Sequence, residues 1–490
     1  MNADHVRLAL LQQNYFPNHR TRSPELPPFF HTRRLTPGVA DAIIAAGKPA
    51  HPYKGCDYVH YTLTRFNGGP RVCGIPHPFP YCTLVRKIHA DWAKIEPQIQ
   101  SRVSAIKPRV HKDGRLFIMD YGDHRYKSRR YLDNQSCASF IARADISSFY
   151  PSLYTHSIPW AIVGIDTAKA NTSNNLWYNA LDRDLRFCRR SETNGVSIGP
   201  GTSSLMAEIV LSQVDRRLEK EFVFERFIDD YTCYATSRSA AQAFLRLLES
   251  ELGKYNLYLN FRKTHITELP APELPEWIDQ LRVGELSANP QDFYQIKMFI
   301  SRALHVAEKY PDGSVLRYAM HALCERNFTT ANGEYVLRRV AGLAQGYLHI
   351  VPCVAAVIAY GYDKGGRFKY GKELLSILAA AAAARRSDAM CWSLHLCKET
   401  GTKLDTAVEQ EIMKSFDTMT LILLYEAGST QIRRAITRFA RKRILSRPPS
   451  VIQRNWMLIH YLLNTGRLKQ NEVTDPSLRA LRVARADLFG

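Results

Sequence analysis

The sequence lacks the patterns of several protein classes. Its ten cysteines are scattered and none forms a Cys-x-x-Cys pair, which disfavours zinc binding and a disulfide framework and makes reduced thiols in a cytosol the simplest interpretation. No segment reaches the roughly 20 apolar residues that span a bilayer, and the nearest one, residues 377–384, ends at two arginines. The N-terminus carries Asp4 and Arg7 without a long apolar core, which argues against a secretory signal. We therefore expect a cytoplasmic protein with no membrane partner.

Acidic residues are outnumbered by basic ones. The 490 residues include 66 Lys plus Arg and 46 Asp plus Glu, which gives a net charge of +20. This excess suits a partner made of phosphate, although charge alone would equally fit a ribosomal or membrane-surface protein. A content of 45% hydrophobic and 23% charged residues is ordinary for a soluble globular protein, and the length predicts more than one domain.

Two adjacent acidic residues, Asp229 and Asp230, lie between runs rich in aromatic and β-branched residues, and Asp145 lies in an upstream strand-like segment. A hairpin can carry the pair at its turn while a neighbouring strand brings Asp145 alongside. Two Mg²⁺ ions about 3.5–4 Å apart could then clamp the attacking and leaving oxygens of a phosphoryl transfer, because Mg²⁺ prefers hard oxygen ligands. Taken alone, Asp-Asp is a common sequence in turns. The surrounding segments therefore decide between a metal site and an ordinary turn.

Four segments occur in a set order around these residues. An Asp is followed five positions later by an aromatic residue, a Gly-rich turn feeds a helix, an aromatic-x-Asp-Asp box follows, and a strand leads to Asn and then Lys-Thr. The segments are 145–150, 195–211, 227–230 and 257–264. In this order and spacing they match the palm of reverse transcriptases, so the chain resembles that family.

The details of the second segment point to one branch of the family. Ser197 and Ile198 stand where most retroviral and group II intron enzymes have Pro-Gln, and Phe227 replaces the commoner Tyr. Ile-Gly-Pro at this place, together with the N-terminal segments 15–17 and 25–30, resembles the abortive-infection and other defence-associated bacterial reverse transcriptases. The resemblance implies antiviral defence in a bacterium, a structured non-coding RNA as template or scaffold, priming from a protein tyrosine, and a homo-oligomer.

The resemblance also assigns catalytic roles. It makes Asp145 and Asp229 the bridging metal ligands, with Asp230 in a supporting role and the backbone carbonyl of Ile146 as a further ligand. The expected cofactor is a pair of Mg²⁺ ions, with Mn²⁺ as the alternative. Lys263 is expected to donate a proton to the departing pyrophosphate; a solvated lysine at a strand end is the competing interpretation.

The substrate is expected to be a dNTP held by side chains near the carboxylates. The ring of Tyr150 would clash with a ribonucleotide 2′-hydroxyl, unless it is simply a core aromatic, and Phe149 is assigned to the same substrate site. Gly199 lies in a loop whose lack of bulk would let backbone and template approach closely; a plain helix-entry turn is the alternative. Arg129 or Arg130 is expected to grip the triphosphate, the alternative being a solvated run of charges.

Composition along the chain predicts three regions. Residues 1–140 read as an N-terminal arm and fingers, 141–270 as the palm, and 271–490 as a helical C-terminal domain set off by three prolines within 270–275. The predicted fold class is α+β, with right-hand-like polymerase fingers and palm, an antiparallel sheet with helices, and then an all-α, HEAT-like domain. In the palm we expect helices at 203–222 and 240–255, a hairpin at 223–236 and a strand at 257–267. Beyond it we expect helices at 292–310, 333–344, 372–386, 405–425, 430–446 and 451–463.

The predicted helix at 430–446 has an apolar stripe and a densely cationic remainder. We expect this face to line a channel for single-stranded product or a folded RNA, with a solvated surface as the alternative.

These features predict an RNA-directed DNA polymerase bound to an RNA template or scaffold and a DNA product. Untemplated, terminal-transferase-like addition by the same site is an alternative. An RNA polymerase or nucleotidyl cyclase could use the same carboxylates, but Tyr150 disfavours ribonucleotides and a cyclase would not need the glycine loop. A non-enzymatic RNA-binding scaffold with a relic palm predicts loss of an acidic ligand, yet Asp145, Asp229 and Asp230 are all present.

Overall fold

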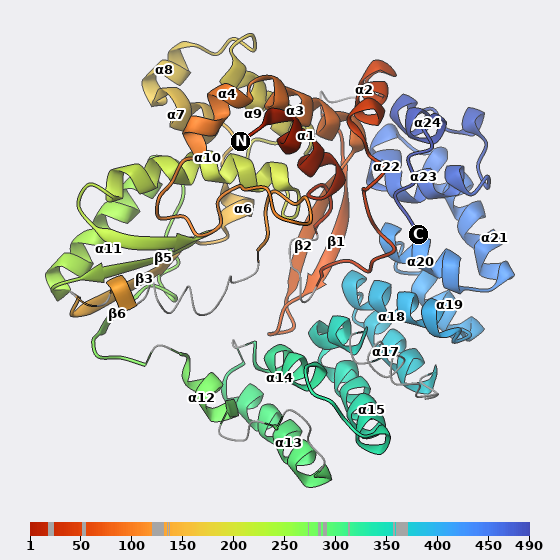
Figure 1. Ribbon diagram of the computed structural model, residues 1–490. Helices are drawn as coiled ribbons and strands as arrows, with labels where there is room; N and C mark the ends of the chain where they lie inside the picture. The colour runs from red at the N-terminus through yellow and green to blue at the C-terminus, as the bar shows by residue number, and fades with distance from the viewer. Residues whose placement is uncertain are drawn as a thin grey trace.

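The computed structural model describes residues 1–490 except 18–23, 51–54, 120–131, 135, 137, 273, 283–285, 288–291, 312–313, 356–357 and 359–370. The described chain is mostly helical and contains two small antiparallel sheets (Figure 1). None of the helices described is long and apolar enough to cross a membrane.

The N-terminal part combines helices with a two-stranded hairpin. Strands β1 (Tyr58–Thr64) and β2 (Pro70–Pro76) pair antiparallel. They are preceded by α1 (Ala3–Gln12) and α2 (Pro37–Ala45) and followed by α3 (Pro78–Ala90), α4 (Trp92–Ile95) and η1 (Glu96–Ile99). Side-chain caps at Asn2 and Thr36 begin the first two helices, because they supply the acceptors that free N–H groups at a helix start require.

The second sheet has the strand order β4-β5-β3-β6, and all its neighbours are antiparallel. Its strands are β3 (Phe140–Asp145), β4 (Val223–Phe227), β5 (Asp230–Ala235) and β6 (His265–Glu268). The side chains of Tyr231 and Cys233 are buried, whereas Asp230 is exposed and Thr232 half-buried. This alternation of period two gives the first part of β5 one buried face, whereas Tyr234 and Ala235 at its end are both buried.

Helices connect the strands of this sheet. They are α6 (Phe149–Ser152), α7 (Ser157–Val163), α8 (Ile165–Ala170), α9 (Trp177–Phe187), α10 (Gly201–Leu218) and α11 (Arg238–Gly253). Helix α11 packs on β3, β5 and β6 and against α10 (Figure 1). The predicted hairpin and the helices predicted at 203–222 and 240–255 are therefore observed.

The strand predicted at 257–267 is wrong for most of its length. Only His265–Glu268 pairs as a strand with β3, while Leu259 makes a single bridge to Ile146. Residues 260–264 form a turn in which the N–H of Lys263 donates to the carbonyl of Asn260 at 2.9 Å. This turn, and not a strand end, carries the lysine.

After the second sheet, the described chain is helical almost to its end. The helices are α12 (Glu276–Arg282), α13 (Phe293–Lys309), α14 (Val315–Cys324), α15 (Thr330–Gly346), η2 (Leu348–Ile350), α17 (Gly371–Ala383), α18 (Ser387–Thr400), α19 (Thr406–Met413), α20 (Thr418–Ala427), α21 (Thr430–Phe439), the π-helix η3 (Ala440–Leu445), α22 (Pro449–Arg454), α23 (Trp456–Asn464), η4 (Gln470–Glu472) and α24 (Pro476–Val483). A helical C-terminal region is thus observed, while its HEAT-like character stays a prediction.

Two helices predicted as single ones are divided. The predicted helix 405–425 breaks before Asp417, whose side chain caps α20 by accepting from the N–H of Thr420. The predicted helix 451–463 divides at Asn455 between α22 and α23. Short polar side chains that bond nearby backbone favour such breaks.

The C-terminal helices return to the N-terminal hairpin, so distant parts of the sequence lie side by side (Figure 1). Asp388 of α18 accepts from the backbone N–H of Thr64 at 2.6 Å and from its hydroxyl at 2.8 Å. Asp57 accepts from Nε of Arg454 at 2.5 Å, and the indole N–H of Trp456 donates to a β2 carbonyl at 3.5 Å. The hairpin is therefore fixed from the side of the C-terminal helices.

Candidate active site

Three carboxylates meet at one end of the four-stranded sheet. Asp145 ends β3 and lies directly opposite Asp230, the first residue of β5. Asp229 lies in the two-residue turn that joins β4 to β5, and its carbonyl accepts the N–H of Ile146 at 3.2 Å. Paired residues on antiparallel strands project on the same side, so Asp145 and Asp230 share a face beside the turn.

The crowding of these carboxylates changes their acidity. Burial, followed by the charge of Asp145, raises the pKa of Asp229 to about 6. Loss of solvent around Asp230, with Asp229 and Asp145 beside it, raises its pKa to about 7. Like charges held together in a partly desolvated site disfavour full ionisation, and such groups are typical of functional sites.

Asp145 has two further partners. Its Oδ2 lies 2.8 Å from Nζ of Lys263, and its Oδ1 accepts from the side-chain amide of Asn260 at 3.1 Å. The hydrogen bond to Asp145 raises the pKa of Lys263, which keeps the lysine charged. The structure therefore places Lys263 at the carboxylates, although it reaches them from a turn.

The donor set suits a hard divalent cation. In the described part of the chain, no group of three or more His, Cys, Asp or Glu side chains is arranged as a ready metal site, and both oxygens of Asp145 are engaged by nitrogen donors. The donors themselves are oxygens, and burial together with their mutual repulsion raises the pKa values of Asp229 and Asp230. A divalent cation relieves such repulsion, so Asp145, Asp229 and Asp230 fit the chemistry of Mg²⁺.

The turn that carries Asp229 has an uncommon backbone conformation. Ile228 has φ 58°, a left-handed value that is unfavourable for a β-branched residue. Nη1 of Arg226 donates to the carbonyl of Ile228 at 2.9 Å. The guanidinium of Arg226 is fully buried and also bonds Asp215 and Glu208 of α10 at 2.7–3.0 Å. A buried ionic network thus holds the turn against α10.

A pocket of about 220 Å³ opens beside Asp229 and Asp230. Tyr150 and Gly199 line it, and their role in substrate binding stays a prediction. The hydroxyl of Tyr150 lies 3.2 Å from Oγ of Ser204, and burial raises the pKa of Tyr150 to about 12, so its ring stays neutral and in place.

One cation in this pocket was not predicted. Arg71 of β2 lines it, and its Nε is buried with no hydrogen-bond partner among the described residues. Its charge lowers the pKa of Asp229, in opposition to the larger effect of burial. An arginine with an unused donor beside acidic groups suits a phosphate ligand. The sequence signal was weak, because Arg71 belongs to a hairpin far upstream of the acidic motifs.

The glycine turn before α10 is occupied by the N-terminal arm. A Cβ on Gly199, which has φ 124°, would lie 2.5 Å from Cβ of Pro17, and one on Gly201 would lie 2.7 Å from Cβ of Asn14. The N–H of Gly201 donates to the carbonyl of Asn14 at 2.6 Å. The close approach expected for a template is thus made here by the chain itself, and Pro17 and Glu25 line the pocket.

The remaining predicted site residues do not line this pocket among the described residues. Phe149 is 2% exposed and lines a small cavity that shares Tyr150 and Ile228 with the pocket, so its side chain lies in the core behind the pocket wall. Arg129 and Arg130 lie outside the described residues.

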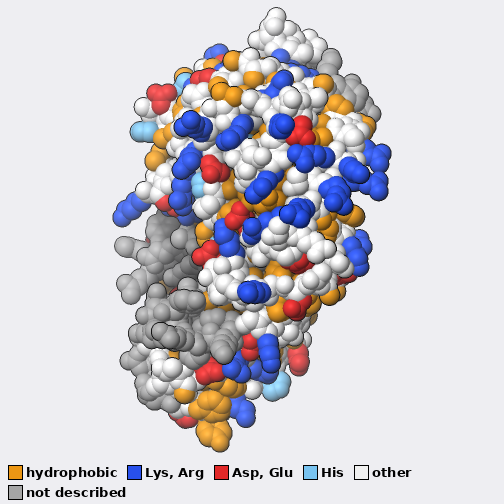
Figure 2. All heavy atoms as spheres, turned by 90° about the vertical axis from the view of Figure 1, so that its right-hand side faces the viewer, with side chains coloured by type: hydrophobic (Ala, Val, Ile, Leu, Met, Phe, Trp, Pro, Cys, Tyr) orange, Lys and Arg blue, Asp and Glu red, His pale blue; other side chains and the backbone are white. Residues whose placement is uncertain are grey.

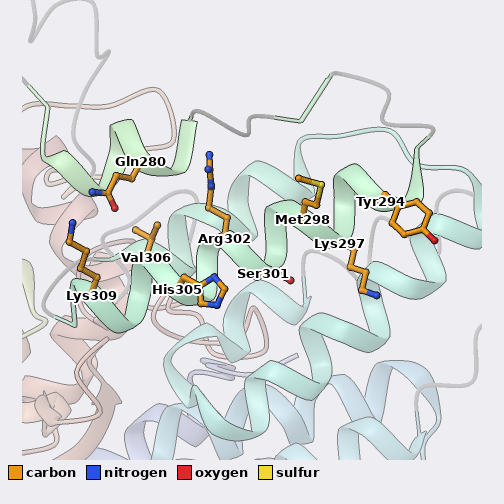
Figure 3. Close-up of a pocket in the computed structure, with 9 residues that line it drawn as sticks. All are labelled: Gln280, Tyr294, Lys297, Met298, Ser301, Arg302, His305, Val306 and Lys309. Carbon is orange, nitrogen blue, oxygen red and sulfur yellow. The ribbon is translucent and has the colours of Figure 1, made fainter.

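A larger hollow of about 770 Å³ lies on α13 (Figure 3). Lys297, Arg302, His305 and Lys309 line it together with the exposed Tyr294. No Asp or Glu is among the described residues that line it, so the acidic chemistry belongs to the smaller pocket.

An antiparallel sheet with an Asp-Asp turn, a third Asp opposite, and a helix that starts at a glycine turn is the arrangement predicted for a polymerase palm. Residues 81–292 match the family described as reverse transcriptase (RNA-dependent DNA polymerase). This segment is similar to reverse transcriptase domains and spans fewer than half of the residues of the chain.

Comparison with curated proteins found no match. The chain is similar to solved structures of telomerase from Candida tropicalis. The apo enzyme truncated from its C-terminal domain has 15% identity and a TM-score of 0.33, over 46% of this chain and 53% of that chain. The apo telomerase has 13% identity and a TM-score of 0.33, over 75% and 69% of the two chains. Telomerase in complex with the TWJ fragment of telomeric RNA has 12% identity and a TM-score of 0.31, over 72% and 66%. The chain thus covers about half of the first of these proteins.

Proposed function

We propose that this protein is an RNA-directed DNA polymerase. The observation that carries the proposal is the pairing of Asp145 with Asp230 across β3 and β5, with Asp229 in the adjoining turn, inside a segment that matches the reverse transcriptase family. The acidic cluster sits at the mouth of a pocket that also contains a tyrosine and an arginine.

The reaction is a nucleotidyl transfer. The oxygen of a primer 3′-hydroxyl, or of a tyrosine hydroxyl, loses its proton to solvent and forms a bond to the α-phosphorus of a dNTP, and the bond from that phosphorus to the bridging oxygen of pyrophosphate breaks. A pair of Mg²⁺ ions, or Mn²⁺, held by the three aspartates and the Ile146 carbonyl would supply charge neutralisation at these oxygens. Lys263, kept protonated beside Asp145, is positioned to give its proton to the departing pyrophosphate.

Two pocket residues account for substrate choice in this proposal. Arg71 takes the triphosphate, a role first expected of Arg129 or Arg130, because it lines the pocket and its buried Nε has no hydrogen-bond partner among the described residues. Tyr150, held by Ser204, excludes the 2′-hydroxyl of ribonucleotides. Arg71→Ala should raise the KM for dNTP roughly 10-fold to 100-fold, since a lost charge-assisted bond costs about 1.5–3 kcal/mol. Arg65→Ala, an exposed arginine at the hairpin turn, is the matched control and should leave KM unchanged.

The experiment that tests the proposal is incubation of the purified protein with Mg²⁺ and each labelled dNTP, followed by protease, nuclease or neither. Labelled polymer that nuclease removes, and that is lost in Asp229→Asn, supports polymerisation. If protease treatment also changes the mobility of the labelled product, the product is attached to protein, which indicates priming from a protein tyrosine. A wild-type protein that adds no nucleotide with any RNA, DNA or protein primer would contradict the proposal.

Untemplated addition by the same site is the second candidate. It is supported by the N-terminal arm, because Pro17 packs against Gly199 where a template was expected to approach. Omission of RNA from the reaction separates the two candidates. Products complementary in sequence to an added RNA indicate copying. Products that have the same base composition with and without RNA indicate untemplated addition.

We further infer a role in bacterial antiphage defence, with a structured non-coding RNA as partner and a homo-oligomeric assembly. This inference rests on the resemblance of the segments around Ile198 and Tyr15 to defence-associated enzymes. Plaque formation on bacteria that express the wild type or Asp229→Asn tests it. Equal plaque numbers across a broad phage panel would argue against a defence role.

A further inference from the structure

The helix predicted to be cationic lies far from the catalytic pocket. Helix α21 and the π-helix η3 lie at the outer edge of the C-terminal helices, on the opposite side of the molecule from the palm sheet (Figure 1). The expectation that this face lines a channel for single-stranded product or a folded RNA stays a prediction, and the position of the helix leaves the role of its charge to be argued from the local contacts.

The charged residues in and around this helix are almost all basic. Residues 428–471 contain ten Lys or Arg and no Asp or Glu. Five of the cations are exposed and have no ion pair or side-chain hydrogen bond among the described residues: Arg434, Arg438, Lys442, Arg443 and Arg447. Figure 2 shows this side of the molecule, where Lys and Arg are more frequent than the scattered Asp and Glu.

Acidic groups close to this face are already engaged. Glu472 pairs with Arg441 at 2.7 Å and Glu411 with Lys414 at 2.6 Å. Glu409 is buried and accepts from Ser429 at the start of α21. Like charges one helical turn apart, as at residues 434, 438 and 442, repel each other. The five cations therefore have no internal compensation and favour an external anion.

An exposed aromatic ring stands beside these cations. Phe416 is 57% exposed, and its ring stacks on Phe439 of α21 with centroids 5.1 Å apart and an angle of 20°. Its backbone has φ 51°, a conformation that L residues other than glycine adopt at a cost. A strained backbone that presents an apolar ring to solvent is typical of a functional position.

We propose that Phe416 and the five cations form a binding surface for an unpaired nucleic-acid strand, named here the α21 surface. A base stacks on the open face of Phe416 while the arginines and Lys442 contact neighbouring phosphates, the combination that single-stranded nucleic acids use. The surface is separate from the catalytic pocket, so the proposal stands whether or not the palm polymerises DNA.

The arrangement of apolar groups argues against a membrane as the partner. The apolar stripe of the helix, Ile432, Ile436 and Ile444, is buried against the protein. A helix that lies on a membrane must present such a stripe to the lipid. A duplex is also disfavoured, because its paired bases are stacked within the helix and are not free to cover Phe416.

Fluorescence anisotropy with labelled ten-nucleotide RNA, DNA of the same sequence, and the corresponding RNA duplex tests the proposal. Wild-type protein should bind the single strands more tightly than the duplex, and the RNA and DNA arms show which sugar is preferred. Arg438→Glu/Arg443→Glu should weaken single-strand binding at least 10-fold and lower the slope of log affinity against log salt by about 1.4, from two lost phosphate contacts. Arg238→Glu/Arg246→Glu, which reverses two exposed arginines of α11, is the charge-matched control.

Phe416→Gly separates binding from folding. Glycine relieves the positive φ, so the melting temperature should stay close to that of the wild type while single-strand affinity falls about 5-fold to 150-fold, the range for one lost stacking contact. Phe416→Trp should retain binding. Unchanged affinity in Phe416→Gly, an equal loss in the α11 control, tighter binding to the duplex, or binding to anionic phosphatidylserine vesicles that the α21 substitutions abolish would each overturn the proposal.

Discussion

Arg226 links the buried ionic network beside α10 to the geometry of the turn that carries Asp229. One guanidinium bonds Asp215, Glu208 and the carbonyl of Ile228 at 2.7–3.0 Å while fully buried. A planar fork with five donors can serve three acceptors at once, whereas a lysine ammonium cannot match this geometry. Because Ile228 has φ 58°, the bond to its carbonyl holds a conformation that the residue would otherwise leave.

The first prediction concerns this residue pair. Arg226→Lys should lower kcat for nucleotide addition about 100-fold through misplacement of Asp229, with a smaller change in the KM for dNTP. Adding Ile228→Gly should restore part of the lost kcat, since glycine adopts a positive φ without steric cost. Adding Ile228→Ala should not restore kcat, because alanine at a positive φ still carries the steric penalty. If the glycine and alanine double variants have the same kcat, Arg226 does not act through the turn.

The raised pKa of Asp229 makes the stability of the folded protein depend on pH. Burial and Asp145 raise its pKa from 3.8 to about 6, so the folded protein binds more protons than the unfolded chain between these values. Stability contributed by this group is present below pH 3.8 and is lost as the pH rises through 6.

The second prediction follows from that sign. In metal-free buffer at pH 8, Asp229→Asn should be more stable than the wild type by on the order of 2 kcal/mol, and the difference should disappear near pH 4. Mg²⁺ should stabilise the wild type more than the variant. Urea unfolding at several pH values measures this, with the exposed Asp279→Asn as control. A variant less stable than wild type at pH 8 would contradict the prediction.

At the scale of elements, the glycine turn and the N-terminal arm form one unit. Gly199 and Gly201 admit Pro17 and Asn14 at distances that a side chain would forbid. Asn14 is fully buried and also accepts from the N–H of Leu116 at 2.6 Å. The arm is therefore part of the wall that positions the start of α10, and through α10 the buried network of Arg226.

The third prediction tests this unit. Gly199→Ala should lower both the melting temperature and nucleotide addition, because its Cβ would meet Pro17 and the positive φ penalises alanine. Gly342→Ala is the matched control, since a Cβ there meets nothing within 4 Å in the middle of α15. It should stabilise the protein by about 0.5–1 kcal/mol. Equal melting temperatures in the two variants would exclude the packing argument.

The elements also show where the sequence was informative. The hairpin around Asp229 and the helices on either side were predictable, because alternation and helical periodicity are local signals. The strand predicted at 257–267 was wrong for most of its length. Leu257 and Leu259 are buried in the alternating pattern of a strand, but only one β-bridge forms there. Arg71 and Pro17 could not be assigned, since their roles depend on contacts between segments far apart in the chain.

At the scale of the whole molecule, the C-terminal tail meets residues 29–31 of the N-terminal arm. Phe30 and Phe489 form a β-bridge, the N–H of His31 donates to the carbonyl of Leu488 at 3.2 Å, and the N–H of Gly490 donates to the carbonyl of Phe29 at 3.0 Å. The rings of Tyr15 and Tyr81 stack with centroids 3.9 Å apart, and Trp456 of α23 continues the stack. The arm that lines the catalytic pocket is thus anchored by the C-terminal helices.

The packing of the C-terminal tail on α23 contains a buried histidine, His460, whose protonation would destabilise this packing. His460 of α23 is fully buried, its Nε2 lies 2.9 Å from the carbonyl of Ala486, and its ring contacts that of Phe489. Burial lowers its pKa from 6.5 to about 4. The neutral ring donates to the Ala486 carbonyl, so protonation would place an uncompensated charge beneath the C-terminal tail.

The fourth prediction concerns acid stability. Because the folded pKa of His460 is depressed, its contribution is present above pH 6.5 and is lost as the pH falls towards 4, by on the order of 3 kcal/mol in total. His460→Gln, which keeps an amide donor but cannot be protonated, should reduce the slope of unfolding free energy against pH in this window. The exposed His305→Gln should leave the slope unchanged. An identical slope in His460→Gln and wild type would show that the packing of the C-terminal tail on α23 does not limit acid stability.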